Sequence, residues 1–258
     1  VRIRAHDAAL ERAQVQRDLD LARELQGGLL PKIFPNRQEA PGIEIFARLD
    51  PAKEVSGDLY DFFFVEPGRL CFVVGDVSGK GIAAGIFMAV TRTLIRATAI
   101  PGRAPLEILT RVNAQLAKEN QANLFVTMIL GIADTQSGKI VYGQGGHNPP
   151  VLLSVAGKPI YEPPGGMPLG VFEDAKFGER ELSLKPGETL LVYTDGVTEA
   201  MNGARDLFGE DRLLEAVRDG ASLSAEKLTE RVVEKVEDFV READRSDDIT
   251  LLAIKRRG

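Results

Sequence analysis

Apolar runs that meet at tight turns restrict this chain to a fold built from antiparallel sheets. Residues 59–76 divide into two strand-like halves at Pro67–Gly68, and residues 124–146 divide in the same way at Ser137–Gly138. Two strands joined by such a short turn form a hairpin, which is antiparallel. Hairpins outnumber strand–helix–strand crossovers here. This argues against a doubly wound parallel sheet and favours antiparallel sheets with helices on their outer faces.

The other elements follow from the same patterns. Residues 43–49 alternate apolar and polar side chains, as a half-buried strand does. The runs PPVLLS, RELSL, ETLLVY and DDITLLAIKR predict further strands, with Pro-Gly turns at 164–165 and 186–187. Helical patterns are found at 81–99, 104–119, about 207–218 and about 224–243. The fold class predicted from the residues is therefore α+β.

A separate helix is predicted at residues 7–30, ahead of this domain. Its apolar side chains form a single narrow stripe, made of Val15, Leu19, Ala22, Leu25 and Leu29. Pro31 and Pro35 end the helical pattern. Such a helix is typical either of a coiled-coil linker or of a cap docked on its own domain, and both readings stay open. The chain thus divides into an N-terminal helical linker, 1–35, and a globular domain, 36–258.

Composition excludes several classes of function. The chain has 258 residues, a net charge of −6 and no long basic cluster, so nothing indicates a nucleic-acid partner. The most apolar stretch, 81–100, contains Arg92 and Arg96, so no membrane span is expected. The single cysteine, Cys71, lies in an apolar run and is expected to fill the core. These features predict a cytoplasmic protein.

Acidic residues are placed where predicted strands begin or end. Glycines 57, 75 and 196 stand beside three of them, and the set comprises Asp58, Asp76, Asp195 and the pair Asp247–Asp248. One Asp-Gly pair is usually only a turn, but four such sites on different strands can meet at one point. Carboxylates gathered together repel each other unless a cation lies between them.

Oxygen ligands of this kind suit Mg²⁺ or Mn²⁺. A zinc site is improbable, because His6 and His147 are far apart in the sequence and no cysteines are paired. The segment GDVSGKG also lacks the glycine spacing of a nucleotide phosphate loop. Two hard ions can activate a water and neutralise a phosphate without any nucleophilic side chain.

Five motifs, in this order, carry a resemblance to a known family. VSGDLYDFF, GDVSGKGIAAGIFMA, GGHNPP, LLVYTDGVTEA and DDITLLAIK are similar to those of the sporulation stage II protein E type of metal-dependent serine/threonine phosphatase. That group belongs to the type 2C protein phosphatase superfamily. The resemblance covers about residues 22–256, and it implies a β-sandwich of two antiparallel sheets flanked by helices.

The resemblance also implies two Mn²⁺ or Mg²⁺ ions and assigns roles to the acids. Asp76 matches the carboxylate that bridges both ions, and Val77 matches a residue that lends its main-chain carbonyl to one of them. Asp58 matches an acid near that same ion. Asp195 and Asp247 match the ligands of the other ion. Asp248 is adjacent and remains a candidate ligand, although Asp247 is favoured, so Asp76, Asp195 and Asp247 form the expected catalytic set.

The function implied is hydrolysis of phosphoserine or phosphothreonine on a regulatory protein by a metal-activated water. By analogy, the substrate is an anti-sigma factor antagonist, in the partner switching of sigma factors. One alternative is a catalytically silent module that binds a partner through the same surface, and another is a metal-dependent phosphatase for a small molecule. The stretch ARELQGGLLP resembles the joint between sensor modules and this domain, which implies an upstream sensor or activator. Our hypothesis is that the N-terminal helix pairs with its copy in a homodimer.

For several other residues the expected roles are less specific. His147 is expected to be structural or to line the cleft, and Asp61 and Glu199 to orient metal-bound waters or face solvent. Residues 171–184 are expected to form a flap, and Leu59, where an aromatic residue is more usual, to lie in the cleft wall. The candidates for a phosphate contact are Arg48, Lys53 and Lys80.

Overall fold

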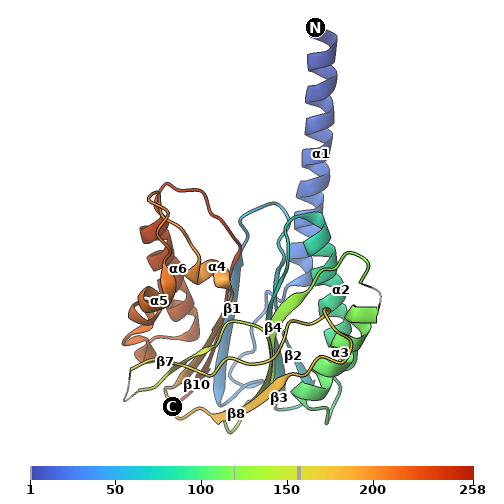
Figure 1. The fold of residues 1–258 in the computed structure, drawn as a ribbon. Coiled ribbons are helices and arrows are strands. Elements are labelled where there is room, and N and C mark those ends of the chain that lie inside the picture. The colour runs from blue at the N-terminus through green and yellow to red at the C-terminus, as the bar shows by residue number, and fades with distance from the viewer. Residues whose placement is uncertain (1, 119, 156–157) are drawn as a thin grey trace.

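The computed structural model describes residues 2–118, 120–155 and 158–258, which fold into a sandwich of two five-stranded sheets (Figure 1). Sheet A has the strand order β1-β10-β9-β6-β7, and sheet B has the order β2-β3-β4-β5-β8. Each neighbouring pair of strands is antiparallel. The antiparallel architecture predicted from the hairpins is therefore confirmed.

The strands occupy the predicted regions, with one short addition. Sheet A consists of β1 (Ile43–Asp50), β6 (Val151–Leu153), β7 (Ile160–Tyr161), β9 (Thr189–Tyr193) and β10 (Ile249–Arg256). Sheet B consists of β2 (Asp58–Glu66), β3 (Arg69–Val77), β4 (Val126–Asp134), β5 (Lys139–Gly145) and β8 (Gly178–Ser183). The strand β7 has only two residues and was not predicted.

Helices cover both outer faces of the sandwich (Figure 1). The helices α2 (Ile82–Thr98) and α3 (Pro105–Lys118) pack on sheet B, and α6 (Ala225–Val240) packs on sheet A with α5 (Gly209–Val217) beside it. The helix α1 (Arg2–Leu29) precedes the sandwich, and two short elements, α4 (Asp195–Thr198) and the 3-10 helix η1 (Gly220–Ser222), follow β9 and α5. Across the described residues, none of the helices is long and apolar enough to cross a bilayer.

Three apolar layers hold these elements together. One lies between the two sheets, one between sheet B and the α2–α3 pair, and one between sheet A and the α5–α6 pair. Cys71 is fully buried in the second layer as a free thiol, which confirms its predicted place in the core. Phe34 stacks on Phe46 and Phe62 at ring distances of 4.6 and 5.1 Å, so the segment between α1 and β1 packs with the sheets.

The turn predicted at 164–165 is wrong, because residues 162–168 form neither a turn nor any regular element. The glycines of this segment serve close packing on β5. A Cβ at Gly166 would stand 2.0 Å from the carbonyl oxygen of Gln144, and the backbone there has a φ of +75°. Glycine is needed at such a position because any side chain would collide with the strand.

The flap predicted at 171–184 is also partly wrong. Its second half is β8, which pairs with β5 at the edge of sheet B. Before β8, Asn113 of α3 holds the chain down: its Nδ2 donates to the carbonyls of Phe172 (2.8 Å) and Glu173 (3.1 Å). The run RELSL was itself predicted to be a strand, and β8 confirms that prediction.

The helix α1 projects away from the sandwich for most of its length (Figure 1). Val15, Leu21 and Leu25 are each more than half exposed. Contact with the domain is made near the end of the helix, where the Gln26 side chain accepts a hydrogen bond from the Ser56 amide (2.9 Å) and donates to the Ser56 carbonyl (2.7 Å). The last turns of α1 are thus fastened to the loop that leads into β2.

Asp61 lies on the outer face of sheet B, beneath α2, and neither of its two predicted roles is correct. Its side chain is fully buried, and it forms a two-bond contact with Arg96, with both N–O distances at 2.7 Å. Arg92 is 3.0 Å away in a second ion pair. Asp61 therefore attaches α2 to the sheet, and it neither faces solvent nor orients a metal-bound water.

We predict that Asp61→Asn lowers the free energy of unfolding by about 3 kcal/mol, because Arg92 and Arg96 lose the buried carboxylate that they share. For a domain of this size, that corresponds to a fall in Tm of about 6–12 °C. Glu107→Gln is the matched control, since Glu107 also contacts two arginines, Arg103 and Arg111, but its side chain is 47% exposed. The control should lose less than about 1 kcal/mol. Equal losses in thermal unfolding would contradict the account.

Candidate metal centre

The acids singled out in the sequence gather at one edge of the sandwich. Asp58 and Asp76 are direct cross-strand partners on β2 and β3 of sheet B. Asp195 follows β9 as the first residue of α4, and Asp247 and Asp248 precede β10, the neighbour of β9 in sheet A. Both sheets therefore contribute carboxylates to the same place, as expected for strand ends that share one core.

Asp58 is the most deeply buried of these acids, at 2% exposure. Its Oδ2 accepts hydrogen bonds from Thr194 Oγ1 (2.7 Å), just after β9, and from Thr250 Oγ1 (2.6 Å) in β10 of sheet A. Burial, followed by the charge of Asp76, raises the pKa of Asp58 well above its usual value, and the two threonine hydrogen bonds act against that rise. Asp58 thus joins the two sheets directly beneath the cluster.

Asp76 occupies the centre of the cluster. Burial and the nearby charges of Asp195 and Asp247 raise its pKa from 3.8 to about 7, although a hydrogen bond with Asp58 acts in the opposite direction. A Cβ at Gly57 would stand 3.0 Å from the carbonyl oxygen of Val77 and 3.5 Å from Asp76 Oδ1. The Val77 carbonyl and the Asp76 carboxylate therefore lie beside the same glycine.

Asp195 stands at the start of α4, close to Glu199 at its end. Burial comes first among the causes that raise the pKa of Asp195, and the charges of Glu199 and Asp247 follow. Gly196 allows α4 to approach the last loop, because a Cβ there would stand 1.9 Å from the carbonyl oxygen of Asp248. Glu199 is exposed, and its charge acts on the cluster through Asp195.

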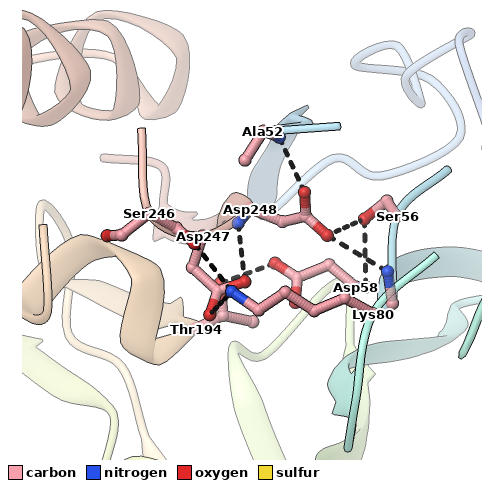
Figure 2. Close-up of polar contacts among 9 residues, drawn as sticks. Ala52, Ser56, Asp58, Lys80, Thr194, Ser246, Asp247 and Asp248 are labelled. Atoms are coloured by element: carbon pink, nitrogen blue, oxygen red, sulfur yellow. Dashed lines mark hydrogen bonds and ion pairs between the residues drawn. The ribbon is translucent and has the colours of Figure 1, made fainter. Parts of the chain in front are cut away.

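The neighbouring acids Asp247 and Asp248 have different surroundings (Figure 2). Asp247 has a side chain that is 37% exposed, and its Oδ2 is 2.8 Å from Lys80 Nζ. Lys80 also donates to the carbonyl of Ser246 at 2.6 Å. Lys80, a residue of the glycine-rich turn after β3, thus lies within the carboxylate cluster.

Asp248 uses both of its carboxylate oxygens to hold the loop before β2 (Figure 2). Oδ1 accepts from the Ala52 amide (2.7 Å), and Oδ2 accepts from Ser56 Oγ (2.7 Å) and the Gly57 amide (3.1 Å). These three donors satisfy a carboxylate well. Asp248 therefore holds the loop before β2 in place, whereas the side chain of Asp247 is directed toward the cluster.

This set of donors fits hard divalent cations. Asp76, Asp195 and Asp247 are oxygen donors, and the pKa values of the first two are raised by burial first and then by the like charges around them. Within the described residues, no three His, Cys, Asp or Glu side chains converge into one closed set of ligands. An ion here would be held by a few of these carboxylates and would keep several waters, which is how Mg²⁺ is commonly bound.

Comparison with known proteins decides the family. The model of the family described as stage II sporulation protein E matches residues 66–257, which is more than half of the chain. The chain belongs to the stage II sporulation protein E family. All of the acids above except Asp58 lie within the matched region.

Individual known proteins resemble the chain over most of its length. Protein IcfG of Synechocystis is 29% identical over 93% of this chain and 41% of its own. The phosphoserine phosphatase RsbU of Bacillus subtilis is 25% identical over 95% of this chain and 71% of its own. The chain thus spans about two fifths of IcfG. Among solved structures, the SiaA-PP2C domain of Pseudomonas aeruginosa superposes with a TM-score of 0.82, at 22% identity, over 96% of this chain and 99% of its own.

His147, from the family motif GGHNPP, is buried behind the cluster. Its Nδ1 is 2.9 Å from Thr127 Oγ1, and Thr127 is the cross-strand partner of Asp76 on β4. Burial lowers the pKa of His147 to about 4, so the ring is neutral near pH 7. This surrounding fits the structural role that the sequence favoured.

Two further expectations are corrected by the geometry. Leu59 is fully buried in the layer between sheet B and α2, so it does not line the cleft. Arg48 pairs with Asp50 at 2.8 Å, whereas Lys80 reaches the cluster, so the structure separates these two phosphate-contact candidates.

Sequence reasoning missed Ser56, Thr194 and Thr250, which position the acids. Their signal was adjacency, since each stands within two residues of one of the acids.

We predict that the metal-free protein loses stability as pH rises from about 4 to 7. The folded-state pKa of Asp76, about 7, lies above its ordinary value of 3.8, so its contribution is complete at low pH and is lost as the group ionises. The loss is at most about 1.4 kcal/mol per pH unit for this one group. Thermal unfolding in chelator should show a shallower pH dependence for Asp76→Asn than for the parent. Identical slopes would contradict the raised pKa.

Proposed function

We propose that this protein is a metal-dependent phosphatase that removes phosphate from phosphoserine or phosphothreonine on another protein. The observation that carries the proposal is the partly buried Asp76 carboxylate, placed among Asp195 and Asp247 at the sandwich edge. The excess of negative charge in this position, which Lys80 offsets only in part, favours binding of Mn²⁺ or Mg²⁺. The similarity to RsbU, a phosphoserine phosphatase, supports the same reaction class.

The residues have distinct roles in this proposal. Asp76, with the Val77 carbonyl beside it, would hold two ions, with Asp58 near one of them and Asp195 and Asp247 on the other. When bound, such ions lower the pKa of a water molecule and neutralise the charge of the phosphate group. Thr194 and Thr250 fix Asp58, and Asp248 fixes the loop through Gly57. Lys80, already 2.8 Å from Asp247, is the cation available to the phosphate group.

The substrate we propose is a small phosphorylated regulatory protein of the anti-sigma factor antagonist type. The family membership and the relation to RsbU support partner switching as the pathway, with an upstream sensor or activator as the source of control. The setting we propose is the cytoplasm, in agreement with the single unpaired cysteine.

Hydrolysis of para-nitrophenyl phosphate tests the reaction class. The parent protein with Mn²⁺ or Mg²⁺ should release nitrophenol, and Asp195→Asn should not. Asp219→Asn is the matched control, because Asp219 is exposed, stands outside the cluster and has a φ of 59°, which asparagine adopts readily. No metal-dependent release from the parent would leave the catalytically silent binding module as the better description.

We propose further that α1 pairs with its copy in a second chain and that this pairing controls the metal centre. The exposed Val15, Leu21 and Leu25 supply apolar surface for a partner helix, and an isolated helix of this kind is marginal in water. A physical route to the centre runs from Gln26 to Ser56, whose Oγ contacts both Asp248 and the Asp58 amide.

Two truncations separate these ideas. Deleting residues 1–20 removes the projecting part of α1 and keeps Gln26, so it should give a folded monomer. Deleting residues 1–30 also removes the Gln26 contacts with the loop, so it should change basal activity several-fold beyond the first truncation. Light scattering measures the mass and phosphate release measures the activity. If the first deletion leaves the number of chains per particle unchanged, the dimer is refuted. If the two truncated proteins have equal activities, the route through Gln26 is refuted.

A further inference from the structure

A cavity of about 240 Å³ lies next to the metal centre, and Asp247 is the one residue of its lining to which the proposed function gives a part in the chemistry. Gly196, Ser246 and Asp247 line the side that it shares with the carboxylate cluster. The last turns of α6 and the loop that follows them form the other side, through Val240 and Ala243. Because the two sites share Asp247, a ligand bound by its phosphate at the cluster would have its neighbouring groups at the mouth of this cavity.

We propose that the cavity binds an aliphatic side chain of the phosphoprotein substrate, one that flanks the phosphorylated residue in sequence. This inference rests on the proposed function, because it places the phosphate at the adjacent cluster. An extended peptide advances about 3.3 Å per residue, so a side chain one to three positions from the phosphoresidue is within range. The cavity would then contribute to the choice of substrate.

The chemistry of the walls favours an apolar ligand. Ala200, Val236, Val240 and Ile249 are buried and form an apolar lining, and Met201, at 38% exposure, stands at the edge. Methionine is flexible and adapts to ligands of different shape. An apolar cavity of about 150 Å³ is enough to hold benzene. A leucine-sized or isoleucine-sized side chain therefore fits a volume of about 240 Å³.

The charges around the cavity balance, which disfavours a charged ligand. Glu237, Asp244 and Asp247 carry the negative charges of its lining, and Arg241 and Arg245 carry the positive ones. Arg245 is 2.6 Å from Glu237, and Lys80 adds a positive charge 2.8 Å from Asp247. The rim is thus polar and close to neutral, as is common for a pocket that accepts an apolar group.

The walls are also held in fixed positions. Arg245 connects the loop to Glu237 of α6 and lies 3.9 Å from Asp50 of β1. Arg241 ends α6 with a φ of 54°, a conformation that costs free energy in a residue other than glycine. Its amide donates to the Glu237 carbonyl at 2.8 Å, which fixes the reversal of the chain. Unusual backbone of this kind is often retained where it shapes a binding site.

Peptides with one variable position test the proposal. A series of alanine-rich phosphoserine peptides would each carry a single leucine at one position, from three before to three after the phosphoserine. We expect leucine at one position to raise kcat/KM about tenfold or more over the all-alanine peptide. Ala243→Phe, which fills the cavity from its loop wall, should abolish that preference and leave para-nitrophenyl phosphate hydrolysis within about twofold. Ala204→Phe, on the exposed loop at 202–206, is the matched control and should retain the preference.

The outcomes separate the inference from the function on which it rests. Equal kcat/KM for all peptides, or a preference that survives Ala243→Phe, would overturn the inference while leaving the phosphatase intact. Loss of para-nitrophenyl phosphate hydrolysis in Ala243→Phe would place the cavity within the metal centre and would also overturn it. If the peptides are poor substrates, their inhibition of para-nitrophenyl phosphate hydrolysis gives the same comparison. No hydrolysis by the parent would remove the proposed function and the inference together.

Discussion

Asp76→Asn should abolish hydrolysis, by about 10³-fold or more, while the protein stays folded. The variant removes the central carboxylate of the proposed two-ion site, and metal ions contribute several kcal/mol to the stabilisation of transition-state charge. The metal-free protein should be as stable as the parent or more stable, because one of several mutually repelling carboxylates has become neutral. Asp195→Asn should lose activity in the same way.

Phosphate release and thermal unfolding in chelator measure the two halves of this prediction. Asp219→Asn makes the same chemical change at an exposed position outside the cluster, and it should alter neither quantity. Activity of Asp76→Asn within about tenfold of the parent would contradict a bridging role. A large loss of stability in chelator would show that Asp76 supports the fold and would contradict the repulsion on which the assignment depends.

Substitutions at the neighbouring acids Asp247 and Asp248 should affect different properties of the protein. Asp247→Asn should reduce activity by about 10²-fold or more and weaken metal binding, with little change in stability, because its carboxylate is partly exposed. Asp248→Asn should lower the free energy of unfolding by about 1–3 kcal/mol. An amide cannot accept all three hydrogen bonds from Ala52, Ser56 and Gly57, so a buried donor would be left unpaired.

Calorimetric metal titration beside thermal unfolding distinguishes the two variants. We expect Asp248→Asn, compared at a temperature where it is folded, to bind metal with an affinity closer to the parent's than Asp247→Asn does. The assignment within the pair is reversed if Asp248→Asn loses metal and keeps its stability while Asp247→Asn retains metal.

Local patterns predicted the sheets and the cluster because both depend on short-range signals. The Pro67–Gly68 turn is a local signal that reverses the chain between β2 and β3. The register of this hairpin then places Asp58 opposite Asp76. Every acid expected at the site is found at one edge of the sandwich. The sequence was enough to predict this cluster, because each of these acids stands where a predicted strand begins or ends.

The errors came from strand faces and from long-range contacts. Leu59 and Asp61 are one and three residues from Asp58, and alternation along β2 directs both to the opposite face, under α2. That signal was present in the sequence and was not applied. The pairing of Asp58 with Thr194 and Thr250 is different in kind, because it joins residues more than 130 positions apart across two sheets. Only the packed sandwich defines such contacts.

Counting bound metal and released phosphate in the same samples tests the central claim most directly. Protein stripped with chelator would receive increasing Mn²⁺, with a phosphoserine-carrying regulatory protein or peptide as substrate. The account predicts no release without metal, and release that rises as the carboxylate cluster fills with two ions per chain. Full release from protein that holds no bound metal would contradict it.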